Sequence, residues 1–108
     1  MIDDFAVNLA VEYLERSFAK GEPADLVGML DHVDYYDRVV MVREEVQEVM
    51  DRCPSVYVHR VDGRVFFTKS PGDREITEED MERNAQIKTD EFWAKYRQLQ
   101  GRDHTPGE

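Results

Sequence analysis

The chain has 108 residues, of which 41% are hydrophobic and 35% are charged, and its formal net charge is −10. This length suits one domain with one core, so we expect residues 1–101 to form a single domain and residues 102–108 a disordered tail. The sequence has no apolar run of about eighteen residues and no basic stretch before an apolar one near its start, which argues against a transmembrane helix and a secretory signal. Cys53 is the single cysteine and cannot form an intramolecular disulfide, so we expect a cytoplasmic protein.

The charges are unevenly distributed along the chain. Residues 1–51 carry 13 acidic and 4 basic groups, and residues 75–108 carry 9 acidic and 5 basic groups. Residues 52–74 form a basic island between them, with 2 acidic and 5 basic groups. The acidic balance argues against broad binding to nucleic acids or anionic membranes, because such binding needs positive charge to displace counterions.

The first predicted helix extends from about Asp4 to Lys20. Its apolar residues recur on one broad face, which is typical of a helix that packs on a core. Asp3 or Asp4 can cap its beginning, and Gly21 can end it.

Two further helices are predicted before the basic island. Pro23 suits the first position of a short second helix, which we expect to end near Asp31 and His32. A third helix is predicted from Asp34 to Cys53, because apolar residues recur there at three- and four-residue steps. Asp34 can cap it, and Pro54 can end it.

The segment 56–69, VYVHRVDGRVFFTK, carries the clearest β signal. An Asp-Gly pair between two runs of β-branched and aromatic residues predicts a two-residue hairpin turn. This turn pairs Val61 with Arg64 and His59 with Phe66, so strands are expected over 56–61 and 64–69. Both faces carry apolar residues, and the pattern leaves open which face is buried.

The last predicted helix begins after Thr77, which forms a variant capping box with Asp80, and Ile76 can pack onto Met81. Gly101 is expected to end this helix. The fold class predicted for the whole chain is therefore mainly α with one β-hairpin, that is α+β.

The predicted order of helix, helix, helix, hairpin and helix resembles a winged-helix domain with an added C-terminal helix. The resemblance covers residues 2–69 or 23–69 and depends on the order of the elements. In that family the third helix usually contacts the major groove of DNA, and the hairpin, or wing, contacts the backbone or minor groove. The resemblance therefore implies that the helix over 34–53 would read DNA, although it has three basic and six acidic residues.

The hairpin interleaves basic and aromatic side chains, a mixture that can bind a nucleic-acid backbone or stack on a base. The candidate nucleic-acid contacts are His59, Arg60, Arg64 and Lys69. The alternative interpretation is a structural hairpin with one wet face and one dry face.

A second candidate site lies in the last helix, where large apolar residues gather. Its members are Phe92, Trp93, Tyr96 and Leu99. Aromatic residues are enriched at interface cores, so this cluster predicts a docking or dimer face. The alternative is that it closes the core over the first and third helices, and in either case Trp93 should be substantially buried.

Few residues suggest catalysis or metal binding. Potential metal ligands cluster at Asp31, His32, Asp34 and Asp37, but capping and helix-dipole roles with a loop histidine explain them more simply. Cys53 with His59 or His32 would be a conceivable nucleophile and base, although a buried cysteine on an apolar face usually acts as a small hydrophobe. We expect no active site, metal or cofactor.

Two functions remain. The first is a non-enzymatic, acidic protein-interaction or regulatory module, which we expect to be a homodimer. A special form of this module is a nucleic-acid mimic that occupies a basic partner. The second is a DNA-binding, transcription-regulator-like protein that contacts DNA through the basic hairpin. The first is preferred because the acidic charge opposes the usual docking of a winged helix on DNA.

Overall fold

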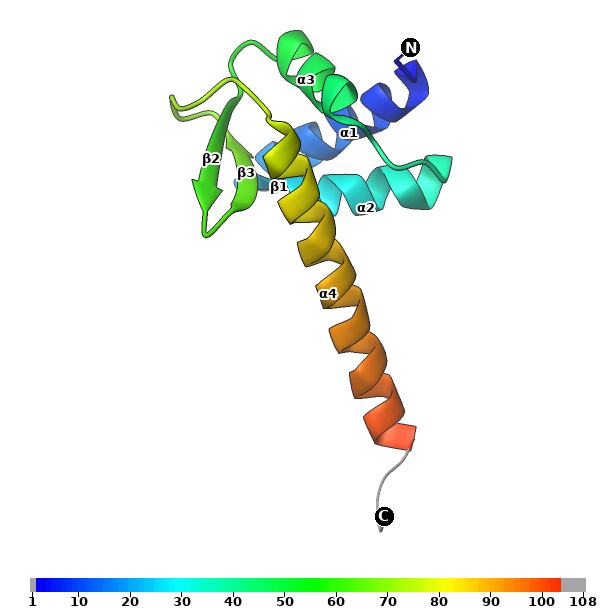
Figure 1. Cartoon of the computed structure of the whole chain (residues 1–108). Helices are drawn as coiled ribbons and strands as arrows, with labels where there is room; N and C mark the ends of the chain where they lie inside the picture. The colour runs from blue at the N-terminus through cyan, green and yellow to red at the C-terminus, as the bar shows by residue number, and fades with distance from the viewer. Residues whose placement is uncertain (1, 104–108) are drawn as a thin grey trace.

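The structure is a computed structural model that describes residues 2–103 and contains four helices and a three-stranded antiparallel sheet (Figure 1). The elements are α1 (Asp4–Ala19), β1 (Ala24–Asp25), α2 (Leu26–Asp37), α3 (Arg43–Arg52), β2 (Tyr57–Val61), β3 (Arg64–Thr68) and α4 (Glu78–Asp103). The predicted fold class, mainly α with a β-hairpin, is confirmed.

Helix α1 begins and ends as its sequence predicts. The Asp3 carboxylate accepts hydrogen bonds from the backbone N–H groups of Phe5 and Ala6, at 3.0 and 3.2 Å. Gly21 follows the helix with a φ of +76°, a left-handed conformation that glycine adopts without steric cost.

The predicted helix over 34–53 is wrong. Helix α2 extends to Asp37 and ends at Arg38, which has a left-handed φ of 56°, and α3 begins only at Arg43. Between the two helices, Met41 is buried in the core while Val40 lies 72% exposed. Glu45 then caps α3, because its carboxylate accepts hydrogen bonds from the backbone N–H groups of Val42 and Asp3.

The predicted helix start at Pro23 is also wrong. The two residues after it form β1, which pairs antiparallel with Phe66 and Phe67 of β3. Asp25 then caps α2 by accepting a hydrogen bond from the Val27 N–H. His32 and Asp34 consequently lie inside α2 rather than in a loop or at a cap.

The hairpin of β2 and β3 has the predicted register, with His59 opposite Phe66 and Val61 opposite Arg64. Asp62 and Gly63 both have positive φ, as a type I′ turn requires. The buried face, left open by the sequence, carries Val56, Val58, Val65 and Phe67.

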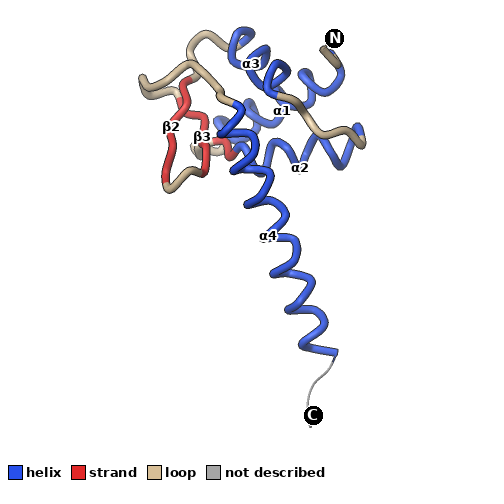
Figure 2. Tube along the Cα trace, viewed as in Figure 1, coloured by secondary structure: helices blue, strands red, loops and turns tan. Residues whose placement is uncertain are grey.

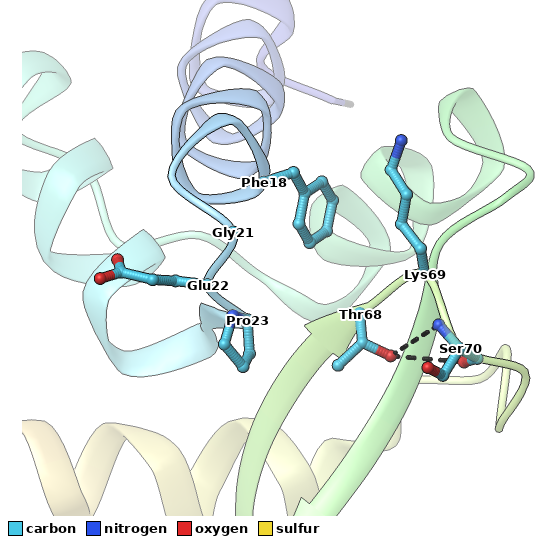
Figure 3. A pocket seen from close by; sticks show the side chains of 7 residues that line it. All are labelled: Phe18, Gly21, Glu22, Pro23, Thr68, Lys69 and Ser70. Atoms are coloured by element: carbon cyan, nitrogen blue, oxygen red, sulfur yellow. Dashed lines mark hydrogen bonds between the residues drawn. The ribbon is translucent and has the colours of Figure 1, made fainter.

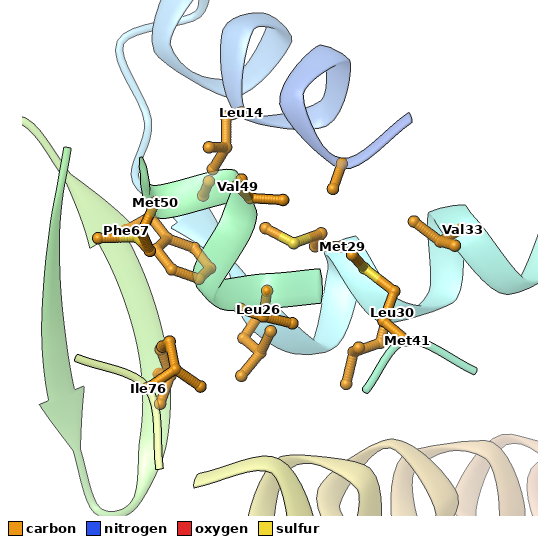
Figure 4. Close-up of a cluster of buried hydrophobic side chains, with 14 of the residues drawn as sticks. Leu14, Leu26, Met29, Leu30, Val33, Met41, Val49, Met50, Phe67 and Ile76 are labelled. Carbon is orange, nitrogen blue, oxygen red and sulfur yellow. The ribbon is translucent and has the colours of Figure 1, made fainter. Parts of the chain in front are cut away.

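One hydrophobic core joins the helices to the sheet (Figure 4). Leu14 of α1, Met29 of α2 and Val49 of α3 meet there. Phe67 reaches this core from β3, and Ile76 reaches it from the segment before α4. The sheet therefore packs its apolar face against the helices. The end of the hairpin that carries the turn contacts α4.

Helix α4 begins at the predicted capping box, in which Thr77 and Asp80 exchange hydrogen bonds of 2.9 and 3.0 Å. The prediction that Gly101 ends this helix is wrong, since it continues to Asp103; residues 104–108, the rest of the predicted tail, lie outside the described residues. The first half of α4 packs on the body, and the second half projects away from it (Figure 2). None of the helices in the described part of the chain has the length and hydropathy that crossing a membrane requires.

Candidate functional site

The projecting half of α4 carries a compact group of large apolar side chains. We call Phe92, Trp93, Tyr96 and Leu99 the aromatic cluster. Its rings are in mutual contact, with centroid distances of 5.4 Å for both Phe92–Trp93 and Trp93–Tyr96. The exposed fractions of the four residues are 60, 48, 43 and 57%, respectively. Exposed groups of large apolar side chains are typical of interaction sites.

The alternative interpretation, in which the aromatic cluster closes the core over the first and third helices, is wrong. Every residue from 89 to 100 is exposed in the single chain, because α4 leaves the body close to where the cluster begins. Glu91 still pairs with Arg64, and Phe92 still lies beside Asp31 and Asp34 of α2. Trp93 is therefore not substantially buried within one chain. Its burial against a second subunit stays a prediction.

An apolar groove lies beside the first half of α4. It has a volume of about 250 Å³, and its walls are the segment 40–43, Leu30 of α2, and Met81 and Ala85 of α4. Glu78 and Glu82 border it. The groove was missed by sequence analysis, because a continuous helix over 34–53 would not have placed Val40 and Val42 beside α4.

Arg60, a predicted nucleic-acid contact, is bound within the chain. Its guanidinium makes two bonds to the Asp80 carboxylate, at 2.7 and 2.8 Å, and one to Asp73 at 2.7 Å. It also donates to the backbone carbonyl of Glu75. Hydrogen bonding to Arg60 lowers the pKa of both aspartates. This network connects the hairpin to the beginning of α4.

Arg64, the second predicted contact, is held in the same manner. Its guanidinium bonds to Asp25 at 2.6 Å and to Glu91 at 2.6 Å, so it links the sheet to α2's cap and to α4. His59 shares a hydrogen bond with the carbonyl of Ser70, and the Lys69 ammonium lies 5.6 Å from the Phe18 ring centroid. These four basic residues of the hairpin are close in sequence but have separate partners.

The helix that the winged-helix resemblance assigns to DNA is acidic. Helix α3 contains two arginines and four carboxylates. Arg52 pairs with Asp4 and Glu48, both at 2.9 Å, and Arg43 contacts the carbonyl of Ile76. Glu44 and Asp51 stay exposed. The outer face of α3 therefore presents negative charge to any partner.

Two polar residues that sequence analysis missed hold these elements together. Asn84 of α4 is fully buried; it accepts a hydrogen bond from the Val65 N–H and donates to the carbonyls of Gly63 and Asp80. Arg74 donates to three carbonyls at the end of α3 and beyond, those of Met50, Cys53 and Val56. The only sequence signal for the buried role of Asn84 is that a polar residue lies inside an amphipathic helix.

The other candidate chemistry is not assembled. Among the described residues, no three His, Cys, Asp or Glu side chains gather to hold a metal ion. Burial raises the pKa of the Cys53 thiol, whereas a nucleophilic cysteine needs a lowered pKa.

A concave surface with a volume of about 440 Å³ lies between the end of α1 and the end of β3 (Figure 3). Phe18 and Pro23 supply its apolar walls, and Lys69 and Glu22 supply its charges. The Thr68 hydroxyl is engaged in hydrogen bonds with the backbone carbonyl and N–H of Ser70. These groups do not form a nucleophile with a base.

Comparison with known proteins found no family model, curated protein or solved structure that matches this chain. The feature that stands out in the geometry and charge of the chain is the exposed aromatic cluster on an otherwise acidic molecule.

Proposed function

We propose that this chain is a non-enzymatic, cytoplasmic interaction module that forms a homodimer through the aromatic cluster of α4. The observation that carries the proposal is the exposure of Phe92, Trp93, Tyr96 and Leu99 on a helix that projects beyond the body. Leaving these side chains in water forgoes the free energy that their burial releases. A partner surface that covers them recovers it.

The acidic helices are the second surface of the module. The net charge of −10 and the exposed carboxylates of α3 favour a partner with a basic face, through complementary potentials. A protein that normally binds nucleic acid is one such partner, and the module would then act as a nucleic-acid mimic. A regulatory role follows from this, because occupying a basic surface blocks its other ligands.

A specific observation favours one alternative, a winged-helix protein that binds DNA. The order α1, β1, α2, α3, β2, β3, with β3 in the middle of the sheet, resembles the winged-helix arrangement. The charges oppose this function, because Arg60 and Arg64 already bind carboxylates and α3 is acidic. Phosphates would have to compete with these internal partners.

The proposed dimer predicts that the environment of Trp93, the only tryptophan, depends on chain concentration. At about 100 μM its emission should be blue-shifted and protected from quenchers, and dilution toward about 1 μM should shift it to the red. The double variant Phe92→Ala/Tyr96→Ala should show the red emission throughout. Phe5→Ala is the matched control, because Phe5 is similarly exposed but lies on α1.

An emission maximum that stays red, with free quencher access at every concentration, would contradict the dimer. The same titration in high denaturant gives the emission of a fully exposed Trp93 as the reference. Agreement between the Phe5→Ala variant and the unmodified chain would show that loss of an exposed phenylalanine alone does not cause the change.

The chain should bind random duplex DNA no more tightly than about 10 μM at physiological salt, within the non-specific range. Fluorescence anisotropy with a labelled duplex at two salt concentrations measures this. The matched variant is His59→Ala/Lys69→Ala, which removes the basic hairpin residues that form no ion pair with a carboxylate among residues 2–103. Submicromolar binding that is lost in this variant would favour the DNA-binding alternative.

A further inference from the structure

We propose that the aromatic cluster of one copy occupies the apolar groove beside α4 of a second copy, so that the two α4 helices pair antiparallel about a two-fold axis between Lys88 and Thr89. This inference rests on the proposed dimer and specifies its geometry. It assigns a role to the groove, which the single chain leaves open.

The groove and the aromatic cluster lie along one face of α4. Met81 and Ala85 line the groove, and Phe92, Tyr96 and Leu99 follow at steps of seven, four and three residues from Ala85. These spacings keep side chains on the same side of an α-helix. The first half of this face therefore borders the concave groove, and the second half carries the protruding aromatic cluster.

A two-fold axis between residues 88 and 89 matches the protruding half to the hollow half. The numbers of two opposite residues then add up to 177. Phe92 of one copy therefore lies opposite Ala85 of the other, and Tyr96 lies opposite Met81. The largest side chains thus meet small or flexible ones. Because the interface is isologous, every contact occurs twice and no aromatic cluster is left over.

The charges of α4 favour this orientation. Residues 78–91 contain six acidic and two basic groups, whereas residues 92–103 contain three basic groups and one acidic group. Antiparallel pairing about residues 88 and 89 places the basic half of each helix along the acidic half of the other. Lys95 lies at the height of Glu82, which borders the groove.

A competing arrangement would press the two aromatic clusters directly against each other. That pairing has its axis near Tyr96, so it brings the two basic halves together and leaves both grooves exposed. Like charges in contact oppose association. The charge pattern therefore selects the groove as the occupied surface.

The area available fits a weak dimer. A fully covered aromatic side chain buries about 150–250 Å², and the three aromatics of each cluster are about half exposed. Two copies therefore offer roughly 600 Å² of aromatic surface, and the surfaces that receive them add to this area. The total lies toward the small end of specific interfaces, so we expect a weak dimer that dissociates on dilution.

Single-cysteine variants in a Cys53→Ser background test the position of the axis. Thr89→Cys lies next to the proposed axis and should give a disulfide-linked dimer under mild oxidation. Lys95→Cys should not, because its two copies would be about 20 Å apart along the helices, beyond the reach of a disulfide. Efficient crosslinking of Lys95→Cys without that of Thr89→Cys would overturn the proposed geometry.

Ala85→Glu tests the groove without disturbing the single chain, since Ala85 is exposed there. A charge on the groove wall should weaken the dimer on the order of 100-fold, while circular dichroism stays unchanged. Unchanged affinity would overturn the groove proposal while the dimer itself stands. An unmodified chain that never dimerises would overturn the proposed function as well, so the two failures are distinguishable.

Discussion

Replacing Arg60 with methionine should lower the free energy of unfolding by about 2–3 kcal/mol. The substitution leaves Asp80, whose side chain is only 9% exposed, without its bidentate partner, and it also frees Asp73. Chemical denaturation at one fixed chain concentration measures the loss. Arg16→Met is the matched control, because its exposed pair with Glu12 should be worth at most about 1 kcal/mol.

The same substitution should change how stability depends on pH. Arg60 holds the pKa of Asp80 and Asp73 below the usual 3.8, so the folded chain keeps these carboxylates ionised in acid where the unfolded chain protonates them. Their stabilisation is therefore complete above pH 3.8 and lost as pH falls through the lowered values. Arg60→Met should flatten this acid branch. A loss no larger than that of Arg16→Met, with an unchanged acid branch, would contradict the structural role of Arg60.

Replacing Asn84 with alanine should lower the free energy of unfolding by about 3 kcal/mol, because it strands the buried Val65 N–H and two carbonyls. Hydrogen exchange adds a local measurement, since the Val65 amide should lose protection before the rest of β3. Asn8→Ala is the control, because Asn8 is exposed and its side chain bonds, among the described residues, only to the side chain of Arg52. Equal losses in the two variants would contradict a stabilising role for the bonds of Asn84 between α4 and the hairpin.

Local sequence signals predicted the elements whose ends are set by neighbouring residues. The Asp62-Gly63 turn determined the register of the hairpin, and the Thr77–Asp80 box determined where α4 begins. The break at Arg38 was not predictable in this way. Its cause is tertiary, since Met41 enters the core and Glu45 caps α3 while also binding the N–H of Asp3, 42 residues away.

The candidate site was predictable in its residues but not in its surroundings. The sequence shows that Phe92, Trp93 and Tyr96 gather on one helix, but not that this half of α4 leaves the body. It also shows Arg60 and Arg64 in a basic island, because formal charge is counted along the chain. Their carboxylate partners, Asp80 and Asp25, lie 20 and 39 residues away and become visible only in the fold.

Sedimentation equilibrium of the full chain over a range of concentrations measures whether two copies associate through α4. The aromatic cluster as a dimer interface predicts twice the mass of one chain at high concentration, with dissociation on dilution. It also predicts a single-chain mass for Phe92→Ala/Tyr96→Ala under the conditions in which Phe5→Ala stays dimeric. A single-chain mass for the unmodified protein at every concentration would show that the aromatic cluster is not a dimer interface.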